Sequence, residues 1–180
     1  MYAVGAKRFD LRSLSPALLN LQLLLVSTNF MSLVFLFLLF LNSACQQGWI
    51  GNGMSCYKLF TSNKTWKNAT EECEKWNARL VKVESRQEND FIKAKILPTN
   101  ENDNYWIGLS HSGQGNVWMW TDGTQLDSGG YENWGNKQPD NKKNKQNCVV
   151  IQIRKSDPDG NGKWHDRRCF REWKYVCENL

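Results

Sequence analysis

Two segments of the chain repeat apolar residues at helical spacing. In residues 65–77 four apolar positions lie three or four residues apart, which predicts a helix with one buried face: Trp66, Ala69, Cys73 and Trp76. In the second segment Ser85 and Glu88 form a capping box ahead of apolar residues that run from Phe91 to Leu97. Because Pro98 cannot continue a helix, we expect the second helix to end there.

Short β-type runs follow, separated by turns rich in Gly, Asn and Asp. They predict strands at 105–109, 117–120, 149–153 and 175–177. The stretch from Asp122 to Asn147 is polar and has no regular period, and a loop of that length in a compact domain is usually functional. Helices followed by strands indicate an α+β fold.

The N-terminus carries the longest apolar run. Residues 33–41 are continuously apolar and precede Asn42-Ser43-Ala44, which is typical of a cleaved signal peptide. An earlier apolar run at 17–26 follows Lys and Arg residues and instead suits a type II signal anchor. Because Met31 offers another start, it stays open whether residues 1–30 belong to the mature product. We expect a signal peptide or anchor at 1–44, one domain at 45–180, and secretion in preference to anchoring.

Six cysteines in 180 residues, without a zinc-type spacing, favour a disulfide framework in an oxidising compartment. Sequence alone leaves fifteen pairings open. The formal net charge is only +5, which does not support nucleic-acid binding. Basic residues nevertheless cluster late in the chain, and either a solvated face or a platform for anionic glycans accounts for them: Lys142, Lys143, Lys145, Arg154, Lys155, Lys163, Arg167 and Arg168.

Catalysis has little support in the residue types present. His111 and His165 are the only histidines, and neither sits near a plausible Ser nucleophile or a free Cys, since all six cysteines are expected to be paired. We expect a protein that is not an enzyme. Two sequons, Asn63-Lys64-Thr65 and Asn68-Ala69-Thr70, predict N-glycosylation in an exported protein, more readily at Asn63 because Asn68 falls in the first helical turn.

Three short motifs accompany the cysteines: Trp106-Ile107-Gly108-Leu109, Gln138-Pro139-Asp140, and Trp164-His165-Asp166 with Cys169. Together they resemble the C-type lectin domain from about Cys45 to Glu178. The resemblance implies two helices flanking short antiparallel sheets, a long irregular ligand-binding loop and core positions for most tryptophans. It also implies three disulfides: Cys45 with Cys56, Cys73 with Cys177, and Cys148 with Cys169.

The resemblance places a calcium-dependent sugar site in the long loop. Its carbohydrate-binding residues would be Gln138, Asp140, Gln146, His165 and Asp166, and all of these except His165 would be calcium ligands. In the family, two vicinal sugar hydroxyls complete the coordination of the ion, which takes six to eight oxygens. Glutamine before the proline and aspartate after it resemble the galactose-type arrangement.

The chain departs from the family pattern at three positions in and beside this site. Gln146 stands where the family has glutamate, Asn147 where it has aspartate, and His165 where it has asparagine. Imidazole nitrogen is a poor ligand for calcium, so we expect weak binding at one site at most, weakening further as the pH falls through about 6.5. The auxiliary calcium site is expected to be absent, because its positions correspond to His111, Gly115, Asn141 and Asn147.

Residues 141–147 also lack the aromatic ring that galactose binders of the family use against the sugar. The leading hypothesis is calcium-assisted binding of galactose-type glycans. The alternatives are a module that binds a protein ligand without sugar, and calcium-independent binding of anionic glycans. Oligomerisation stays open.

Overall fold

The computed structural model describes residues 45–98, 102–111, 117–126, 129–154, 156 and 161–180. The expected signal peptide or anchor, Lys155 and Gly115 therefore lie outside the described residues. In the described part of the chain, no helix combines the length and apolar character needed to span a membrane.

Both expected helices are present, and the first is shorter than predicted. Helix α3 spans Trp66–Glu74, begins at the N-cap Thr65 and buries Ala69 and Cys73. The prediction extended it to Asn77, but Asn77 adopts a left-handed conformation with φ 53°, which does not continue an α-helix.

Helix α4 spans Arg86–Phe91 and continues into the π-helical turn η2, Ile92–Ile96. The Ser85 hydroxyl accepts a hydrogen bond from the backbone N–H of Glu88, as in a capping box. The Glu88 carboxylate, however, accepts from the backbone N–H of Glu84 and not from that of Ser85. The predicted N-terminus is therefore confirmed with one partner shifted by a residue.

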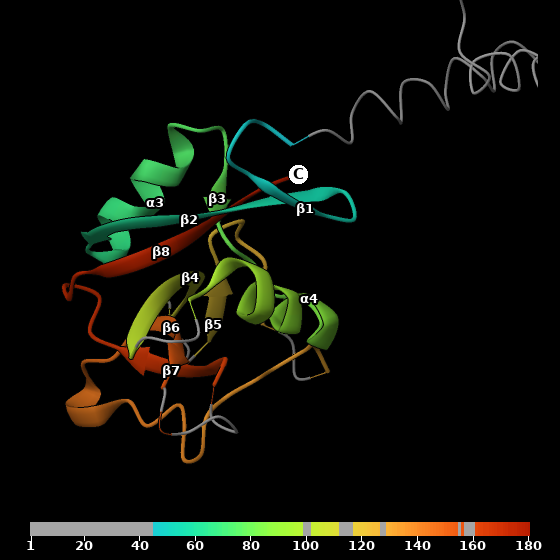
Figure 1. Cartoon of the computed structure of the whole chain (residues 1–180). Helices are drawn as coiled ribbons and strands as arrows, with labels where there is room; N and C mark the ends of the chain where they lie inside the picture. Colours follow the sequence, from blue (N-terminus) through green and yellow to red (C-terminus); the bar gives the residue numbers. More distant parts are fainter. Residues whose placement is uncertain (1–44, 99–101, 112–116, 127–128, 155, 157–160) are drawn as a thin grey trace, which may run out of the picture. The chain divides into compact units, whose positions relative to one another are not determined.

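In the part of the chain that the structure describes, eight strands form the sheet: β1 Ile50–Asn52, β2 Ser55–Lys64, β3 Arg79–Leu80, β4 Asp103–His111, β5 Trp118–Trp120, β6 Cys148–Ile153, β7 Lys163–Arg167 and β8 Trp173–Asn179. Their order is β1-β2-β8-β4-β6-β7, with β3 paired to β8 and β5 to β4. Among the named strands of the described residues, all pairings are antiparallel except that of β4 with β8, where Tyr105 lies opposite Lys174. Figure 1 shows the long β2 and β8 strands side by side near α3, and β7 at the far edge.

The three disulfides are those expected: Cys45–Cys56, Cys73–Cys177 and Cys148–Cys169. The second joins α3 to β8 across a sequence separation of 104 residues. A link over so long a loop removes much conformational freedom from the unfolded chain, typically contributing ~2–4 kcal/mol. The third joins the start of β6 to the turn that follows β7, beside the long loop.

The interior consists of two clusters of buried side chains, and tryptophans are prominent in both. Trp106 and Trp164 are fully buried, and Trp118 and Trp134 pack against the first cluster. The expectation that most tryptophans are structural is confirmed. Gly108 allows β4 to approach its neighbours closely, because a Cβ there would lie 2.7 Å from the backbone oxygen of Leu80.

Candidate functional site

Strand β7 positions the centre of the candidate site. Its side chains alternate, so Trp164 and Asp166 are buried while His165 is only partly buried on the other face. The Trp164 ring packs edge-on against Trp134 and Trp120, with centroids 5.8 Å away in each case. Its Nε1 donates a hydrogen bond to the buried Asn89 Oδ1 at 3.0 Å. The core thereby fixes the backbone two residues before Asp166.

Asp166 joins the long loop to the sheet. Its carboxylate accepts hydrogen bonds from the backbone N–H of Asp140 (3.1 Å) and of Asn141 (2.6 Å). Its backbone oxygen accepts from Gln146 Nε2 (2.5 Å) and from Arg167 Nη1 (2.8 Å). Burial raises the pKa of the Asp166 carboxyl, and the two backbone donors only partly offset that rise. Three predicted site residues, Asp140, Gln146 and Asp166, are thus brought together.

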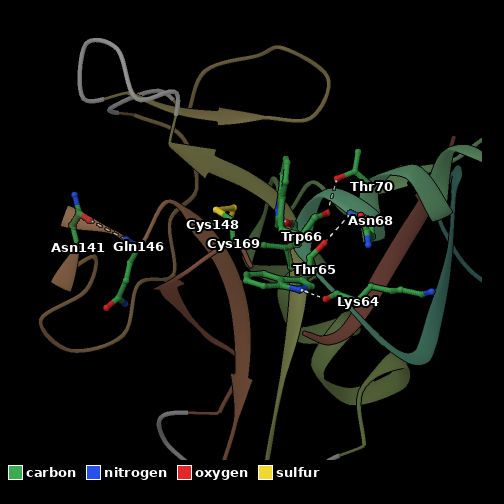
Figure 2. The surroundings of a disulfide bond; sticks show 11 residues. Lys64, Thr65, Trp66, Asn68, Thr70, Asn141, Gln146, Cys148 and Cys169 are labelled. Carbon is green, nitrogen blue, oxygen red and sulfur yellow. Dashed lines mark hydrogen bonds between the residues drawn. A yellow bond between two sulfur atoms is a disulfide. The ribbon is translucent and has the colours of Figure 1, made fainter. Parts of the chain in front are cut away.

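The loop itself has an unusual backbone. The Gln138–Pro139 peptide bond is cis, and Lys137, Asn141 and Lys143 have positive φ angles of 58°, 37° and 62°. The short helix η3, Lys142–Asn144, follows Asn141. Figure 2 shows the Asn141 side chain turned toward Gln146, whose backbone N–H donates to Asn141 Oδ1 at 3.2 Å. Asn tolerates the left-handed conformation better than most residues, which suits it to this turn.

Gln138 carries an unpaired oxygen. Its Oε1 is buried, and no donor within the described residues reaches it. A buried polar atom without a partner is costly, and an added cation or donor would satisfy it. This oxygen, with the carboxylates of Asp140 and Asp166, fits the all-oxygen preference of calcium.

The fit is weak because neighbouring donors compete with a cation. Gln146 Nε2 and Arg167 Nη1 both donate to the backbone oxygen of Asp166, so hydrogens occupy that oxygen. Among the predicted ligands, only Asp140 and Asp166 contribute negative charge. Within the described ranges, no three His, Cys, Asp or Glu side chains form a metal-binding group.

His165 is held against the long loop. An added Cβ on Gly135 would lie 2.7 Å from His165 Nε2, so the imidazole packs directly on the Gly135 backbone. Burial, reinforced by the positive charges of Arg167 and Arg154, lowers the pKa of His165 to about 4. The expected titration near pH 6.5 is therefore wrong, because this imidazole stays neutral until much lower pH.

The predicted basic cluster divides into parts with different surroundings. Lys142, Lys143 and Lys145 are exposed, whereas Lys163 Nζ donates to Asn133 Oδ1 at 2.8 Å and helps to hold the loop on β7. Arg167 and Arg168 line a cavity of about 270 Å³ together with Gln146, Arg171 and Trp173.

Sequence reasoning missed the last two of these residues. Arg171 and Trp173 follow Cys169 closely, and a positive charge and an aromatic ring so near a disulfide cysteine could have pointed to them.

Comparison with known proteins identifies one family model, the Lectin C-type domain, over residues 62–179. Asialoglycoprotein receptor 1 of Mus musculus is 33% identical over 141 residues, which cover 76% of this chain and 45% of the receptor. C-type lectin lectoxin-Phi1 of Philodryas olfersii is 31% identical over 136 residues, covering 74% of this chain and 83% of that protein. The chain spans less than half the length of the receptor it matches.

A solved structure of the cow C-type carbohydrate-recognition domain of CD23, determined in the presence of GlcNAc2Man3 oligosaccharide, superimposes with a TM-score of 0.64. The two are 30% identical, and the match covers 77% of this chain and 97% of that domain. The similarity therefore extends through almost the entire domain of the solved structure.

Proposed function

Because this chain belongs to the C-type lectin domain family, we propose that it is a lectin that binds galactose-type glycans with weak assistance from calcium. The family includes carbohydrate-recognition domains, and the similar proteins are named as lectins and receptors, not as enzymes. We therefore propose a binding function without catalysis, carried by the domain at 45–180.

The observation that carries this proposal is the unpaired oxygen of Gln138. It is buried next to the cis Pro139, and Asp140 follows on the same loop. Gln138, Asp140, Gln146 and Asp166 are the residues that would hold calcium. A bound calcium ion leaves coordination positions open to the oxygens of vicinal sugar hydroxyls.

The side chains of the loop act on the sugar through hydrogen bonds. An amide at Gln138 supplies both a donor and an acceptor, whereas the Asp140 carboxylate supplies only acceptors. This order of groups favours the galactose-type hydroxyl pair. Asp166 holds Asp140 and Asn141 by their backbone N–H groups, so it positions the loop as well. Weak single-site affinity follows from the limited negative charge and from the lack of an aromatic ring at 141–147.

A galactose resin tests the proposal. The protein expressed from the full chain is loaded in calcium, then washed with EDTA, and a second column is washed with salt. We expect retardation on the resin that EDTA abolishes. Passage without retardation in calcium contradicts the proposal. Retention that resists EDTA and yields to salt indicates the alternative, calcium-independent binding of anionic glycans, because exposed charge contacts are screened.

A protein-binding module without sugar recognition is the second candidate. The observation that favours it is the pair of donors, Gln146 Nε2 and Arg167 Nη1, that already occupy the Asp166 backbone oxygen. Such a module is expected to pass through the galactose column without retardation, both in calcium and in EDTA.

Export fits the three disulfides, and we propose that the protein is secreted, with a type II membrane anchor as the alternative. Both sequon asparagines, Asn63 and Asn68, are exposed. Figure 2 shows the Thr65 side chain beside Asn68, whose backbone N–H donates to Thr65 Oγ1. Since Asn63 precedes the helix and Asn68 lies within it, we expect higher glycan occupancy at Asn63. Peptide mass spectrometry checks this order, and equal or reversed occupancy contradicts it.

A further inference from the structure

Three of the five side chains that line the cavity beside the long loop are positively charged. Arg167, Arg168 and Arg171 contribute three guanidinium groups, and Gln146 and Trp173 complete the wall. No acidic side chain among the described residues lines it. Its volume is about 270 Å³, and since one water occupies ~30 Å³, it has room for a sulfate or carboxylate group.

The walls of this cavity are held by the fold. Trp173 packs on the buried Trp106, with ring centroids 4.7 Å apart. The backbone N–H of Arg171 donates to the oxygen of Arg168 at 3.0 Å, which closes the turn that presents both side chains. Cys169, within the same turn, is tied to Cys148 at the start of β6. The three arginines are therefore carried by a braced turn and strand.

Arg167 is partly buried among other positive groups. With the amide of Gln152 oriented to satisfy its neighbours, the Gln152 oxygen accepts from Arg167 Nη2 at 2.9 Å and from Arg154 Nη2 at 3.0 Å. A neutral amide is thus interposed between two cations, and the carboxylates of Asp166 and Asp140 offset the positive charge of Arg167 only in part.

Gln146 connects the cavity to the proposed sugar site. It lines the cavity, and its Nε2 donates to the backbone oxygen of Asp166, the residue that holds Asp140. A glutamate at position 146, the residue that the family pattern implies, would place a negative charge among the arginines. The amide instead lowers the negative charge available to calcium and leaves the cavity cationic.

We propose that this cavity binds the anionic substituent of an acidic galactose-type glycan, with a sulfate ester as the favoured group. The proposal rests on the proposed lectin function and names the class of glycan. Guanidinium groups bind planar or tetrahedral oxyanions with paired N–H donors, and such charge-assisted bonds are stronger than neutral ones. Trp173 adds an apolar ring against which the sugar can pack.

Binding of four probes tests the proposal: methyl galactoside, the same galactoside with one sulfate ester, galactose capped by sialic acid, and a sulfated tyrosine peptide. The protein is expressed from the full chain and titrated in calcium and in EDTA. We expect about tenfold tighter binding of the sulfated than of the neutral galactoside, a ratio that falls with added salt.

Two variants and one control separate a specific cavity from general positive charge. The double variant R168Q/R171Q is expected to lower the ratio of sulfated to neutral affinity to nearly one. Gln146→Glu is expected to lower the same ratio by adding a negative charge and removing none of the arginines. Lys95→Gln, an exposed position on η2 that does not line the cavity, removes one positive charge and leaves the ratio unchanged. Thermal unfolding of each variant verifies that it is folded.

The four probes distinguish failure of the cavity from failure of the lectin function. The cavity proposal is supported if either acidic sugar binds more tightly than the neutral one and if both R168Q/R171Q and Gln146→Glu abolish that difference. The acidic sugar that binds more tightly shows whether the cavity prefers sulfate or carboxylate. Equal affinity for neutral and acidic sugars overturns the cavity proposal and leaves the lectin function standing. Sulfated galactoside bound in EDTA, without any binding of the neutral sugar, supports the cavity and overturns the calcium-assisted function. Binding of the sulfated peptide alone overturns the glycan as ligand.

Discussion

Replacing Gln146 by Glu together with His165 by Asn is the sharpest test of the calcium contribution. The change adds one carboxylate and exchanges an imidazole for an amide oxygen, both of which suit a hard cation. The backbone oxygen of Asp166 loses its donor from Gln146 but keeps the one from Arg167. After the double substitution, the backbone oxygen of Asp166 therefore still accepts one hydrogen bond.

The size of the effect follows from the charges around position 146. Two unit charges 4 Å apart in water interact by ~1 kcal/mol, so a carboxylate gains ~2 kcal/mol with a divalent ion. Attraction of the new carboxylate to the arginines of the cavity offsets ~1 kcal/mol of that gain. With a further contribution from the amide oxygen that His165→Asn introduces, the net gain is about 1.4 kcal/mol, or about tenfold in calcium affinity.

Isothermal titration with calcium at neutral pH measures this change. The natural protein, both single variants and the double variant are compared with Gln87→Glu, which adds the same charge at an exposed position of α4. Gln87→Glu should leave calcium affinity unchanged, and galactose retention should rise with calcium affinity in the double variant. If the double variant takes up no calcium, this loop cannot form the proposed site, and the protein-binding function becomes the better hypothesis.

Three further predictions concern stability and pH. Asn89→Ala leaves the buried Trp164 Nε1 without its acceptor and should cost ~1–3 kcal/mol in the free energy of unfolding, measured by urea denaturation. Gly135→Ala should lower the free energy of unfolding by ~1–3 kcal/mol, because the new Cβ meets the imidazole of His165. Most of this loss should vanish when His165 is replaced by the shorter Asn; an equal loss in both backgrounds refutes the contact. Burial raises the pKa of Asp122, but hydrogen bonds from Thr124 and Lys82 outweigh that effect and lower the pKa to about 2. The ionised carboxylate therefore contributes roughly 1–2 kcal/mol to the free energy of unfolding; this contribution is complete above pH ~4 and is lost as the pH falls through about 2. Asp122→Asn should therefore destabilise the protein much more at pH 7 than at pH 2.

The neutral state of His165 changes the expected acid response of the site. Since its pKa is about 4, this residue cannot weaken calcium binding between pH 7 and pH 5 by becoming charged. Burial by the long loop is the main cause, and it is a property of packing. The residue type alone had predicted that the His165 imidazole titrates near pH 6.5.

The sequence by itself determined the local elements and much of the interior. The three- and four-residue spacing of Trp66, Ala69 and Cys73 predicted α3, and the Ser85 cap predicted the start of α4. These signals are local, because a helix repeats every 3.6 residues and its caps lie within one turn. The motifs around Trp106 and Trp164 pointed to the family, and the family resemblance selected the three disulfides that the structure contains.

Only the tertiary structure decided what surrounds each candidate residue. The parallel pairing of β4 with β8, the packing of His165 on Gly135 and the cavity shared by Arg171 and Gln146 join residues far apart in the chain. No periodicity reports such contacts, because the distance between two side chains depends on how whole elements pack. Electrostatic effects fall with that distance and grow with burial, so charge, pKa and ligand preference at this site follow from the fold.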